Sequence, residues 1–464
     1  MITVPLADEA ATNRLGADIA AILAPGDSVG LVGDLGAGKT TLARAILRAL
    51  ANDPAMEVPS PTFTLVQIYD EGRVPVRHAD LYRLQNPAEA DELGLGEPGA
   101  ADLIEWPQLP QPATITLTFD GETARTATIS GEAPFVTRLA RLRQGREKLP
   151  DLGALIPLKQ DASTRNYFRT PAGILMDAPA FTPPADSYLT KARLADGNMA
   201  AFLCVGALLN ARGIAAPTVR AIAPDDGFLL LEDFGDETIA PKGTANPERY
   251  LLAAEALAHF HQDPHPKTLD GPAGTHHTPP TFDADLAAIE VALYPEWARQ
   301  EPIDPTYIAL WRTVIDALPR ADDRLALRDV HAPNLLWRAQ ETGIQRVGFI
   351  DYQDAMVAPS AYDVVSLAQD ARVPIDDGLE AAILARYFAH RPEADTQAFR
   401  TAYHVLGAER AARIAGVFHR LDLRDGKPHY RAYLPNVLRN LSKNLAAAPA
   451  LAPLAAWFAK HPPQ

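Results

Sequence analysis

The chain is poor in the features that mark exported or membrane-bound proteins. Among its 464 residues there is one cysteine, Cys204, so an internal disulfide is excluded. Cys204 lies in the apolar stretch Ala200–Leu209, which predicts a buried position in a helix. No apolar run is long enough to span a bilayer, and the first residues lack the basic and apolar segments of an export signal. These absences predict a cytoplasmic protein without membrane contact.

Positive charge is also scarce, and it is distributed unevenly. The net charge is −15, with 8 Lys and Arg against 19 Asp and Glu in residues 1–135. Residues 136–150 hold 5 against 1, and residues 151–464 hold 30 against 38. Phosphate contacts supply most of the affinity for nucleic acids, so the acidic N-terminal part is a poor stand-alone binder of them. We expect no direct DNA binding, and any RNA to be held by a partner.

The first of two phosphate-handling motifs lies between a predicted strand at Ser28–Val32 and a predicted helix at Lys39–Leu50. The intervening loop has the pattern G-x-x-x-x-G-K-T, in which backbone N–H groups surround the phosphates of a nucleotide. We expect Lys39 to neutralise phosphate charge and the Thr40 hydroxyl to reach Mg²⁺. The predicted nucleotide-binding residues are Gly33, Asp34, Gly36, Ala37, Gly38, Lys39, Thr40 and Thr41.

The second motif has the layout of a kinase-like phosphotransferase. Asp329 and Asn334 are five positions apart, as in the catalytic loop of kinases, and Asp351 ends an apolar strand predicted at Val347–Ile350. In this layout Asp329 takes or orients the proton of the acceptor hydroxyl, while Asn334 and Asp351 hold Mg²⁺ on the phosphates of ATP. Such enzymes do not use a P-loop, so one active site does not need both motifs. We therefore expect a fusion of two ATP-dependent proteins.

Residues 1–135 predict an α/β P-loop domain. A helix is expected at Asp8–Leu23, before the first predicted strand. Turn residues separate the remaining predicted strands, which are Thr64–Tyr69, Arg73–His78, Leu103–Glu105, Thr114–Phe119 and Arg125–Ser130. Residues 136–150 form a basic linker, in which Val136–Lys148 predicts a short amphipathic helix. We interpret it as a solvated connector in preference to a membrane or RNA contact.

From Asp151 onward the pattern changes to that of an α+β, protein-kinase-like fold. Strands are predicted at Asp161–Thr170, Gly173–Met176 and Phe228–Leu231, and one helix at Ser187–Arg212. The rest is mostly helical, interrupted by proline-rich turns. A small mixed lobe (residues 151–235) is therefore followed by a larger helical lobe (residues 236–464).

Four motifs in the N-terminal domain resemble the TsaE family of bacterial ATPases, which act in the biosynthesis of tRNA threonylcarbamoyladenosine (t6A). They are the loop G-D-L-G-A-G-K-T-T-L, the segment S-P-T-F-T-L-V from Ser60, H-A-D-L-Y-R-L from His78, and I-E-W-P from Ile104. The resemblance covers about residues 1–135. It implies that Thr40 and Glu105 hold Mg²⁺ and that Asp80 contributes to ATP hydrolysis.

The same resemblance implies that Trp106 supports the nucleotide site and that residues 60–64 form a switch-like loop. The family works with two partner proteins of the t6A machinery. Partners of this kind fit the acidic charge of residues 1–135, since they would hold the tRNA. Without the resemblance, Asp80 at a strand end is equally well explained as a helix cap, and Trp106 as a core residue.

The nucleotide cover of the C-terminal domain departs from the usual kinase pattern. No glycine-rich loop precedes its first strands, and the usual strand lysine is missing. The segment D-A-S-T-R-N-Y-F-R stands in that place, so Ser163 and Thr164 are predicted to cap phosphates. Lys159 or Arg165 is the candidate for the missing positive charge.

Together with the catalytic motif, the segments that depart from the usual kinase pattern resemble the AmgK family within the aminoglycoside-phosphotransferase superfamily. The resemblance rests on D-A-S-T-R-N-Y-F-R, L-M-D-A-P, L-E-D-F-G, D-V-H-A-P-N-L and I-D-Y-Q-D-A, and it covers about residues 150–445. It implies ATP-dependent phosphorylation of the anomeric hydroxyl of N-acetylmuramate and N-acetylglucosamine, in cell-wall recycling. Asp329 would be the catalytic base, Asn334 and Asp351 the metal ligands, and Glu232 a hinge residue facing the adenine.

Two alternatives stay open for the C-terminal domain. It is a kinase for another small alcohol, such as an aminoglycoside, choline or homoserine, or it is a nucleotide-binding module with a regulatory role. The missing strand lysine favours the module, and the intact set of Asp329, Asn334 and Asp351 favours a kinase. The sequence does not identify the sugar-binding residues, communication between the two sites, or the oligomeric state.

Overall fold

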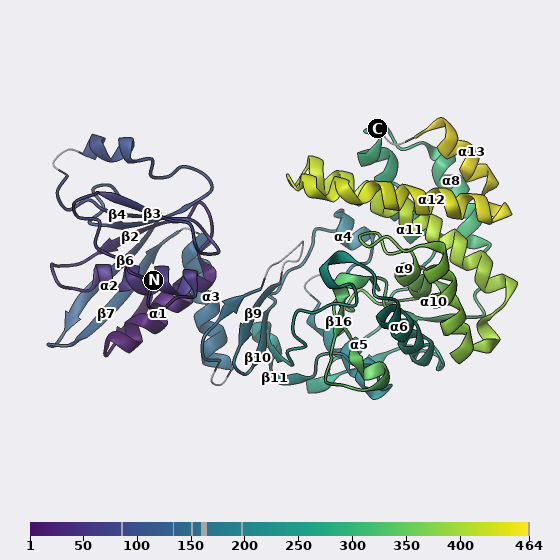
Figure 1. The fold of residues 1–464 in the computed structure, drawn as a ribbon, viewed down its shortest axis with the longest axis horizontal. Coiled ribbons are helices and arrows are strands. Elements are labelled where there is room, and N and C mark those ends of the chain that lie inside the picture. Colours follow the sequence, from purple (N-terminus) through teal and green to yellow (C-terminus); the bar gives the residue numbers. More distant parts are fainter. Residues whose placement is uncertain (85–86, 133, 150–151, 159–164, 196–197, 463–464) are drawn as a thin grey trace. The chain divides into compact units, whose positions relative to one another are not determined.

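The computed structural model describes residues 1–464 except 85–86, 133, 150–151, 159–164, 196–197 and 463–464. The chain divides into two compact units (Figure 1). The first unit comprises Met1–Pro179 and Val219–Leu231, and the second comprises Ala180–Thr218 and Glu232–Gln464. Among the described residues, no helix combines the length and the apolar character needed to cross a membrane.

A seven-stranded sheet forms the centre of residues 1–131, in the order β1-β7-β6-β2-β5-β4-β3. Strands β6, β2, β5 and β4 run parallel to one another, and the outer strands pair antiparallel. The predicted α/β fold is thereby confirmed. The strands are β1 (Ile2–Leu6), β2 (Ser28–Val32), β3 (Val66–Tyr69), β4 (Val76–Asp80), β5 (Ala101–Glu105), β6 (Ala113–Asp120) and β7 (Ala124–Gly131).

Helices α1 (Glu9–Ile22) and α2 (Lys39–Ala51) pack against each other beside this sheet. The side chain of Asp8 accepts the backbone N–H of Ala11 and caps α1, as the helix prediction from Asp8 requires. Strand β1 was not predicted. It is a five-residue edge strand that pairs only with β7 among the described strands. It was missed because no turn residues precede it to mark where a strand begins.

Helix α3 (Pro134–Lys148) confirms the amphipathic helix predicted at Val136–Lys148 but not the solvated connector. Phe135, Leu139 and Leu142 are buried in an apolar core that also contains Leu175 and Phe228 of the five-stranded sheet described next. Three arginines of the helix form ion pairs with the segments on either side of it in sequence. Arg138 pairs with Asp27 and Arg146 with Asp18, both in residues 1–131, and Arg141 pairs with Asp177 of the five-stranded sheet. The interpretation as a solvated connector is therefore wrong, because one face of α3 is part of the core.

A second sheet of the first unit has the order β11-β12-β10-β9-β8. Its strands are β8 (Ile156–Pro157), β9 (Asn166–Thr170), β10 (Gly173–Asp177), β11 (Val219–Ala223) and β12 (Phe228–Leu231). All pairs are antiparallel, and the bounds of β12 are those predicted from sequence. This small sheet matches the predicted mixed lobe of a kinase-like fold.

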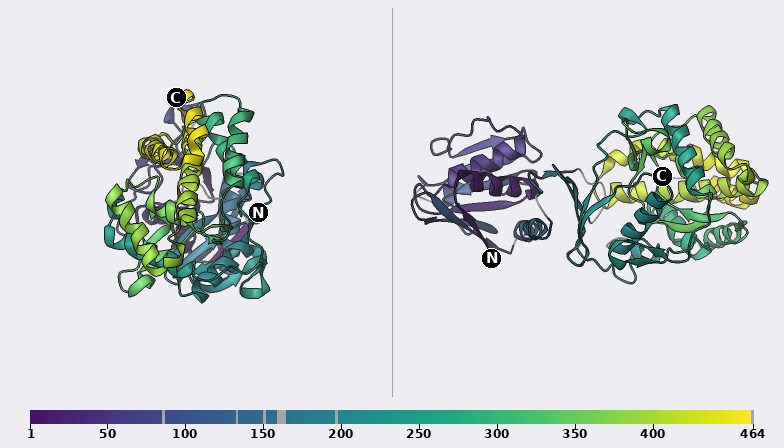
Figure 2. Two further views of the ribbon diagram at one scale, coloured as in Figure 1. Left: turned by 90° about the vertical axis from the view of Figure 1, so that its right-hand side faces the viewer. Right: turned by 90° about the horizontal axis from the view of Figure 1, so that it is seen from below.

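The second unit is mainly helical, as predicted, and its long helices α11 and α12 lie side by side (Figure 2). Three short strand pairs accompany the helices: β13 (Leu269–Asp270) with β14 (His276–His277), β15 (Asp323–Ala326) with β18 (Met356–Pro359), and β16 (Leu335–Trp337) with β17 (Val347–Phe349). The helices are α4 (Tyr188–Lys191), α5 (Met199–Ala211), α6 (Pro247–Phe260), α7 (Ala284–Val291), α8 (Pro305–Asp316), α9 (Ala361–Ala368), α10 (Asp377–His390), α11 (Gln397–Leu423), α12 (Leu434–Ala447) and α13 (Ala452–Lys460).

The single helix predicted at Ser187–Arg212 is wrong, because the chain forms α4 and α5 there. Ser187 caps α4 by accepting the N–H of Thr190, and Asn198 caps α5 by accepting the N–H of Ala201. A side chain that caps a new helix replaces the helical hydrogen bonds of the preceding turn. Cys204 lies in α5 and is buried, as predicted.

Candidate active sites

The P-loop site forms where three parallel strands end. In the register of the sheet, Glu105 on β5 is opposite Leu31 on β2 and Asp80 on β4. The P-loop follows β2 directly and leads into α2. Because the carboxyl ends of parallel strands meet at one edge, the sheet brings the predicted phosphate loop and both predicted carboxylates together.

The P-loop backbone requires its glycines. Gly33, Gly36 and Gly38 have φ angles of 148°, 81° and 103°, in the region that L side chains rarely adopt. At Gly33 a Cβ atom would also lie 2.4 Å from the carbonyl oxygen of Leu117. The loop can therefore approach a ligand closely, as a phosphate cradle must.

Lys39, the first residue of α2, is buried beneath this loop. Its ammonium group donates to the carbonyl oxygens of Gly33 at 2.8 Å and Asp34 at 2.9 Å. It lies 3.6 Å from the ring centroid of Trp106, so the predicted nucleotide-site tryptophan contacts the predicted phosphate-binding lysine. Burial lowers the pKa of Lys39, and Glu105 is the largest opposing influence.

Glu105 connects two neighbours through its two carboxylate oxygens. Thr40 donates to Oε2 at 2.8 Å, and the Nε2 atom of His78 lies 2.9 Å from Oε1. The side chains of His78 and Glu105 are 0% and 2% exposed. The predicted metal ligands Thr40 and Glu105 are therefore adjacent. Their hydroxyl and carboxylate oxygens suit Mg²⁺, which usually binds one or two protein oxygens and completes its coordination with phosphate oxygens and water.

Asp80 joins the predicted switch-like loop to the site. Its Oδ2 atom accepts from the Ser60 hydroxyl at 3.1 Å and the Thr62 hydroxyl at 2.6 Å. Its Oδ1 atom accepts the backbone N–H of Tyr82 at 3.0 Å. Asp80 is 5% exposed, so it is a buried carboxylate with a full set of donors and not a simple surface cap.

The three residues predicted for the kinase-like site also lie together. Asp329, Asn334 and Asp351 line one small cleft in the second unit. Strands β16 and β17 set this arrangement, because Leu335 pairs with Phe349 and so places Asn334 next to the end of β17. The Ile350 N–H donates to the carbonyl oxygen of Asn334 at 3.0 Å.

The amide of Asn334 is oriented by the catalytic loop itself. Its nitrogen donates to the backbone oxygen of Asp329 at 3.0 Å, which leaves the amide oxygen as the group for a metal. Arg328 and Asp351 have left-handed φ angles of 73° and 58°. Strained residues of this kind cluster at functional sites, where the surrounding structure enforces them.

Two buried aspartates, which the sequence analysis missed, hold the loop from behind. Asp363 on α9 accepts the backbone N–H groups of Leu327 at 2.7 Å and Arg328 at 3.0 Å. Asp370 accepts the N–H of Ala332 at 2.7 Å. A sequence signal exists only in their position after the motif: Asp363 lies in α9, which follows β18, and Asp370 lies two residues beyond the end of α9.

Charged neighbours set the electrostatics of Asp329. The guanidinium of Arg413 on α11 lies 3.8 Å from its Oδ1 atom, and the Asp329 side chain is 29% exposed. Although burial opposes the shift, the positive charges of Arg413, His331 and Arg410 lower the pKa of Asp329 to about 2. Asp354, near the same loop, behaves in the opposite way, because burial raises its pKa to about 6.

The predicted nucleotide cover is only partly described. Ser163, Thr164 and Lys159 lie outside the described residues, and Arg165 is 3% exposed in the first unit. Glu232 follows β12; its carboxylate accepts from the Thr218 hydroxyl at 2.8 Å and pairs with Arg338 at 3.0 Å. The side chain of Glu232 is therefore engaged within the second unit.

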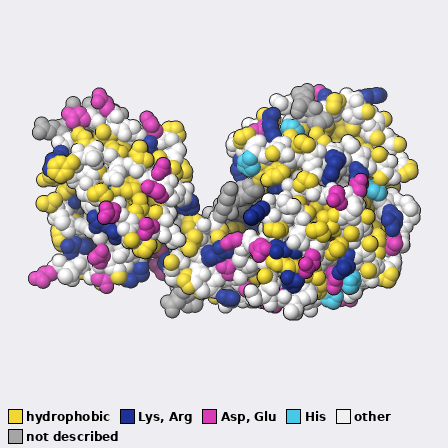
Figure 3. Space-filling model, viewed as in Figure 1, with side chains coloured by type: hydrophobic (Ala, Val, Ile, Leu, Met, Phe, Trp, Pro, Cys, Tyr) yellow, Lys and Arg dark blue, Asp and Glu magenta, His cyan; other side chains and the backbone are white. Residues whose placement is uncertain are grey.

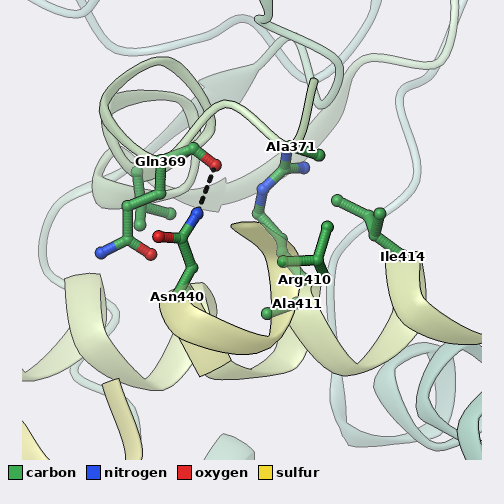
Figure 4. A pocket seen from close by; sticks show the side chains of 9 residues that line it. Gln369, Ala371, Arg410, Ala411, Ile414 and Asn440 are labelled. Atoms are coloured by element: carbon green, nitrogen blue, oxygen red, sulfur yellow. Dashed lines mark hydrogen bonds between the residues drawn. The ribbon is translucent and has the colours of Figure 1, made fainter. Parts of the chain in front are cut away.

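A further small cleft lies between α9, α11 and α12 (Figure 4). Its polar lining includes Gln369, Arg410 and Asn440, and the amide of Asn440 donates to the backbone oxygen of Gln369. Arg410 also donates to the backbone oxygen of Arg328 at 3.0 Å. Arg410 thus connects this cleft to the catalytic loop.

Comparison with known proteins identifies two families in succession. Residues 6–128 match the family "Threonylcarbamoyl adenosine biosynthesis protein TsaE", and residues 154–400 match the "Phosphotransferase enzyme family". An N-acetylmuramate/N-acetylglucosamine kinase of Caulobacter vibrioides is 39% identical over 332 residues, which cover 65% of this chain and 90% of that protein.

A tRNA threonylcarbamoyladenosine biosynthesis protein TsaE of Nostoc sp. is 40% identical over 144 residues, covering 28% of this chain and 86% of that protein. Among solved structures, a choline/ethanolamine kinase family protein of Mesorhizobium loti aligns with a TM-score of 0.44 and 15% identity. That alignment covers 69% of this chain and 98% of that protein.

Proposed function

Because the chain belongs to the TsaE family through its N-terminal part and to the phosphotransferase enzyme family through the remainder, we propose that it links two metabolic tasks. The N-terminal domain hydrolyses ATP for the t6A modification of tRNA. The C-terminal domain transfers the γ-phosphoryl group of ATP to the anomeric hydroxyl of N-acetylmuramate and N-acetylglucosamine, as a step of cell-wall recycling. Both tasks use cytoplasmic ATP. The proposed domains are residues 1–135 and 151–464, joined by residues 136–150.

In the ATPase, the P-loop backbone binds the phosphates and Lys39 moves from the loop carbonyls to the phosphate oxygens. Thr40 and Glu105 would hold Mg²⁺, which neutralises phosphate charge when bound. Asp80 orients the attacking water, and the Ser60 and Thr62 hydroxyls hold Asp80 in place. The loop 60–64 can then respond to the γ-phosphate through Asp80.

Partner proteins are expected on the loops around this site. Leu35, Phe63 and Tyr82 are exposed at 78%, 82% and 56%, although all three are large apolar side chains. Each of them lies in or beside a segment of the predicted site, so this part of the surface offers apolar side chains to a partner protein. On the face drawn in Figure 3, acidic side chains are scattered over the first unit among apolar and basic ones, without a continuous basic patch, which supports indirect contact with tRNA.

In the kinase, Asp329 orients the acceptor hydroxyl, while Asn334 and Asp351 would hold Mg²⁺ on the ATP phosphates. Phosphoryl transfer depends mostly on positioning and charge neutralisation, so these three groups are the minimum set. The placement of all three on one cleft is the observation that carries the proposal.

The electrostatics of Asp329 favour an acceptor that gives up its proton readily. With a pKa of about 2, Asp329 is a weak base that can orient a hydroxyl better than it can remove a proton from it. An anomeric hydroxyl is more acidic than an ordinary alcohol. It therefore needs less help from a base than the alcohols of choline or homoserine.

The test is phosphate transfer from ATP to a panel of N-acetylated amino sugars, aminoglycosides, choline and homoserine. The full-length chain with Lys39→Ala is used, so that ATP hydrolysis at the P-loop does not consume the donor. We expect phosphorylation of N-acetylmuramate and N-acetylglucosamine with loss of the reducing end. NMR of the product that places phosphate on any carbon other than the first contradicts the proposal.

A further inference from the structure

We propose that His78 is a positioning residue of the P-loop ATPase, which fixes the carboxylate of Glu105 for the metal ion. This inference rests on the proposed ATPase function of the N-terminal domain. The role is distinct from that of a ligand, since the geometry places His78 behind Glu105. It holds one oxygen of Glu105 while the other faces Thr40.

The strand register builds this arrangement. His78 lies two positions before Asp80 on β4, so both side chains are on the same face of the sheet. Strands β4 and β5 are parallel, and Asp80 is opposite Glu105. His78 therefore contacts the Glu105 carboxylate from a position two residues before the end of β4. It therefore approaches Glu105 from inside the domain, and the P-loop approaches it from outside.

The hydrogen-bond partners available to the buried ring determine which nitrogen of His78 donates to Glu105. The side chain of His78 is 0% exposed, and its Nδ1 atom has no hydrogen-bond partner among the described residues. A proton on Nδ1 would leave a buried donor unpaired, whereas a proton on Nε2 is donated to Oε1 of Glu105 at 2.9 Å. His78 thus acts as a donor aimed at Glu105.

The consequence is a fixed carboxylate plane. With Oε1 held by His78, Oε2 stays 2.8 Å from the Thr40 hydroxyl, so the two predicted ligands remain side by side before Mg²⁺ binds. Outer partners that orient metal ligands commonly contribute 10–100-fold in metal affinity or activity. Without His78, the Glu105 side chain would be free to rotate away.

The experiment measures Mn²⁺ binding to the full-length chain in the presence of ATP, by electron paramagnetic resonance of free Mn²⁺. Glu105→Gln first identifies the binding class that belongs to the P-loop site. His78→Met removes the donor at similar size, and His78→Gln keeps an amide N–H near the position of Nε2. Tyr69→Phe is the matched control, because the Tyr69 ring centroid lies 6.4 Å from that of His78 and its buried hydroxyl has no partner among the described residues.

We expect His78→Met to weaken the Glu105-dependent class by about 10–100-fold, with ATP binding in the absence of metal preserved. His78→Gln and Tyr69→Phe should bind Mn²⁺ as the unmodified chain does. Equal affinity in His78→Met, or equal losses in the Met and Gln variants, overturns the inference. If His78→Met fails to fold, His78→Asn replaces it, because the shorter amide does not reach Glu105.

Failure of the underlying function looks different. If Glu105→Gln removes no class of Mn²⁺ sites, the metal assignment of the P-loop is wrong whatever His78 does. If Glu105→Gln removes a class that His78→Met leaves unchanged, the ATPase assignment survives and only the role of His78 is rejected.

Discussion

The two phosphate sites of this chain differ in how deeply their predicted functional side chains are buried. In the P-loop site the predicted functional side chains hydrogen-bond to one another or to the loop: Thr40 with Glu105, and Lys39 with the carbonyl of Gly33. In the kinase-like site Asp351 is exposed and Asp329 is 29% exposed, and the support comes from Asp363 and Asp370 behind the loop.

The two sites are therefore held in their active arrangement in two different ways. Buried polar groups that satisfy one another form a network in which the loss of one member affects the others. A loop held by its backbone keeps its shape when a side chain that faces the cleft is changed. Substitutions should therefore have spreading effects in the P-loop site and confined effects in the kinase-like site.

The largest expected effect is that of Asp329→Asn on sugar phosphorylation. The change removes the negative charge with which the carboxylate orients the acceptor hydroxyl. Because phosphoryl transfer depends mostly on positioning, turnover should fall by about 10³-fold. Asp363 and Asp370 bind the loop backbone, so the binding of ATP should stay nearly unchanged. Isothermal titration with ATP and steady-state kinetics check both parts; a large loss of ATP affinity would show that Asp329 also supports the nucleotide.

The next effect is that of Lys39→Ala on ATP hydrolysis. Removing one preorganised cationic group should reduce turnover by about 10²-fold or more. Because Lys39 also donates to the loop carbonyls and contacts Trp106, nucleotide affinity should fall as well. Malachite-green phosphate release and fluorescent-nucleotide binding measure the two quantities, with Arg14→Ala at the exposed face of α1 as control. Wild-type affinity and turnover in Lys39→Ala contradict the P-loop assignment.

How much of these sites could be predicted depends on how far apart along the chain the interacting residues are. The strands Ser28–Val32 and Phe228–Leu231 were predicted with the observed bounds, because an apolar run between turn residues is a local signal. Asp329 and Asn334 were also found together, since their contact follows from a five-residue spacing.

Other contacts arise only from packing. His78 meets Glu105 through the register of β4 and β5, and Asp363 meets Leu327 through the placement of α9. No short-range pattern encodes these pairs. The burial of α3 was missed for the same reason, because its composition is basic while the neighbours that pair with its arginines lie far away in sequence.

Helix α3 offers a test of whether the two regions are separable. We expect a C-terminal fragment that starts at Pro134 and one that starts at Asp151 both to fold, as the proposed domain boundary requires. The shorter fragment should be less stable for two reasons. It lacks Leu142, which belongs to the same apolar core as Phe228, and it lacks Arg141, which lies over the Phe228 ring and pairs with Asp177.

The measurement is urea unfolding of both fragments. Leu142→Ala in the longer fragment serves as an intermediate, with an expected loss of about 2–5 kcal/mol from a buried leucine. Equal stability of the two fragments would show that α3 belongs with the N-terminal domain alone. Failure of both fragments to fold would show that the domains are not separable within residues 134–150.

The smallest effect concerns the buried carboxyl of Asp354 and is a matter of pH. Its pKa is raised to about 6, mainly by burial, so the folded state favours the neutral form. The resulting stability is fully present below the usual aspartate pKa of about 4 and is lost as the pH rises to about 6.

Asp354→Asn stays neutral at every pH and can still accept the N–H of Ala195, which donates to Oδ1 at 2.6 Å. The thermal midpoint of the variant, relative to the unmodified chain, should therefore rise between pH 4 and pH 6 and stay level above it. Asp285→Asn, an exposed aspartate of the same unit, controls for the general loss of negative charge. A difference between Asp354→Asn and the unmodified chain that does not change with pH would show that Asp354 is ionised throughout this range.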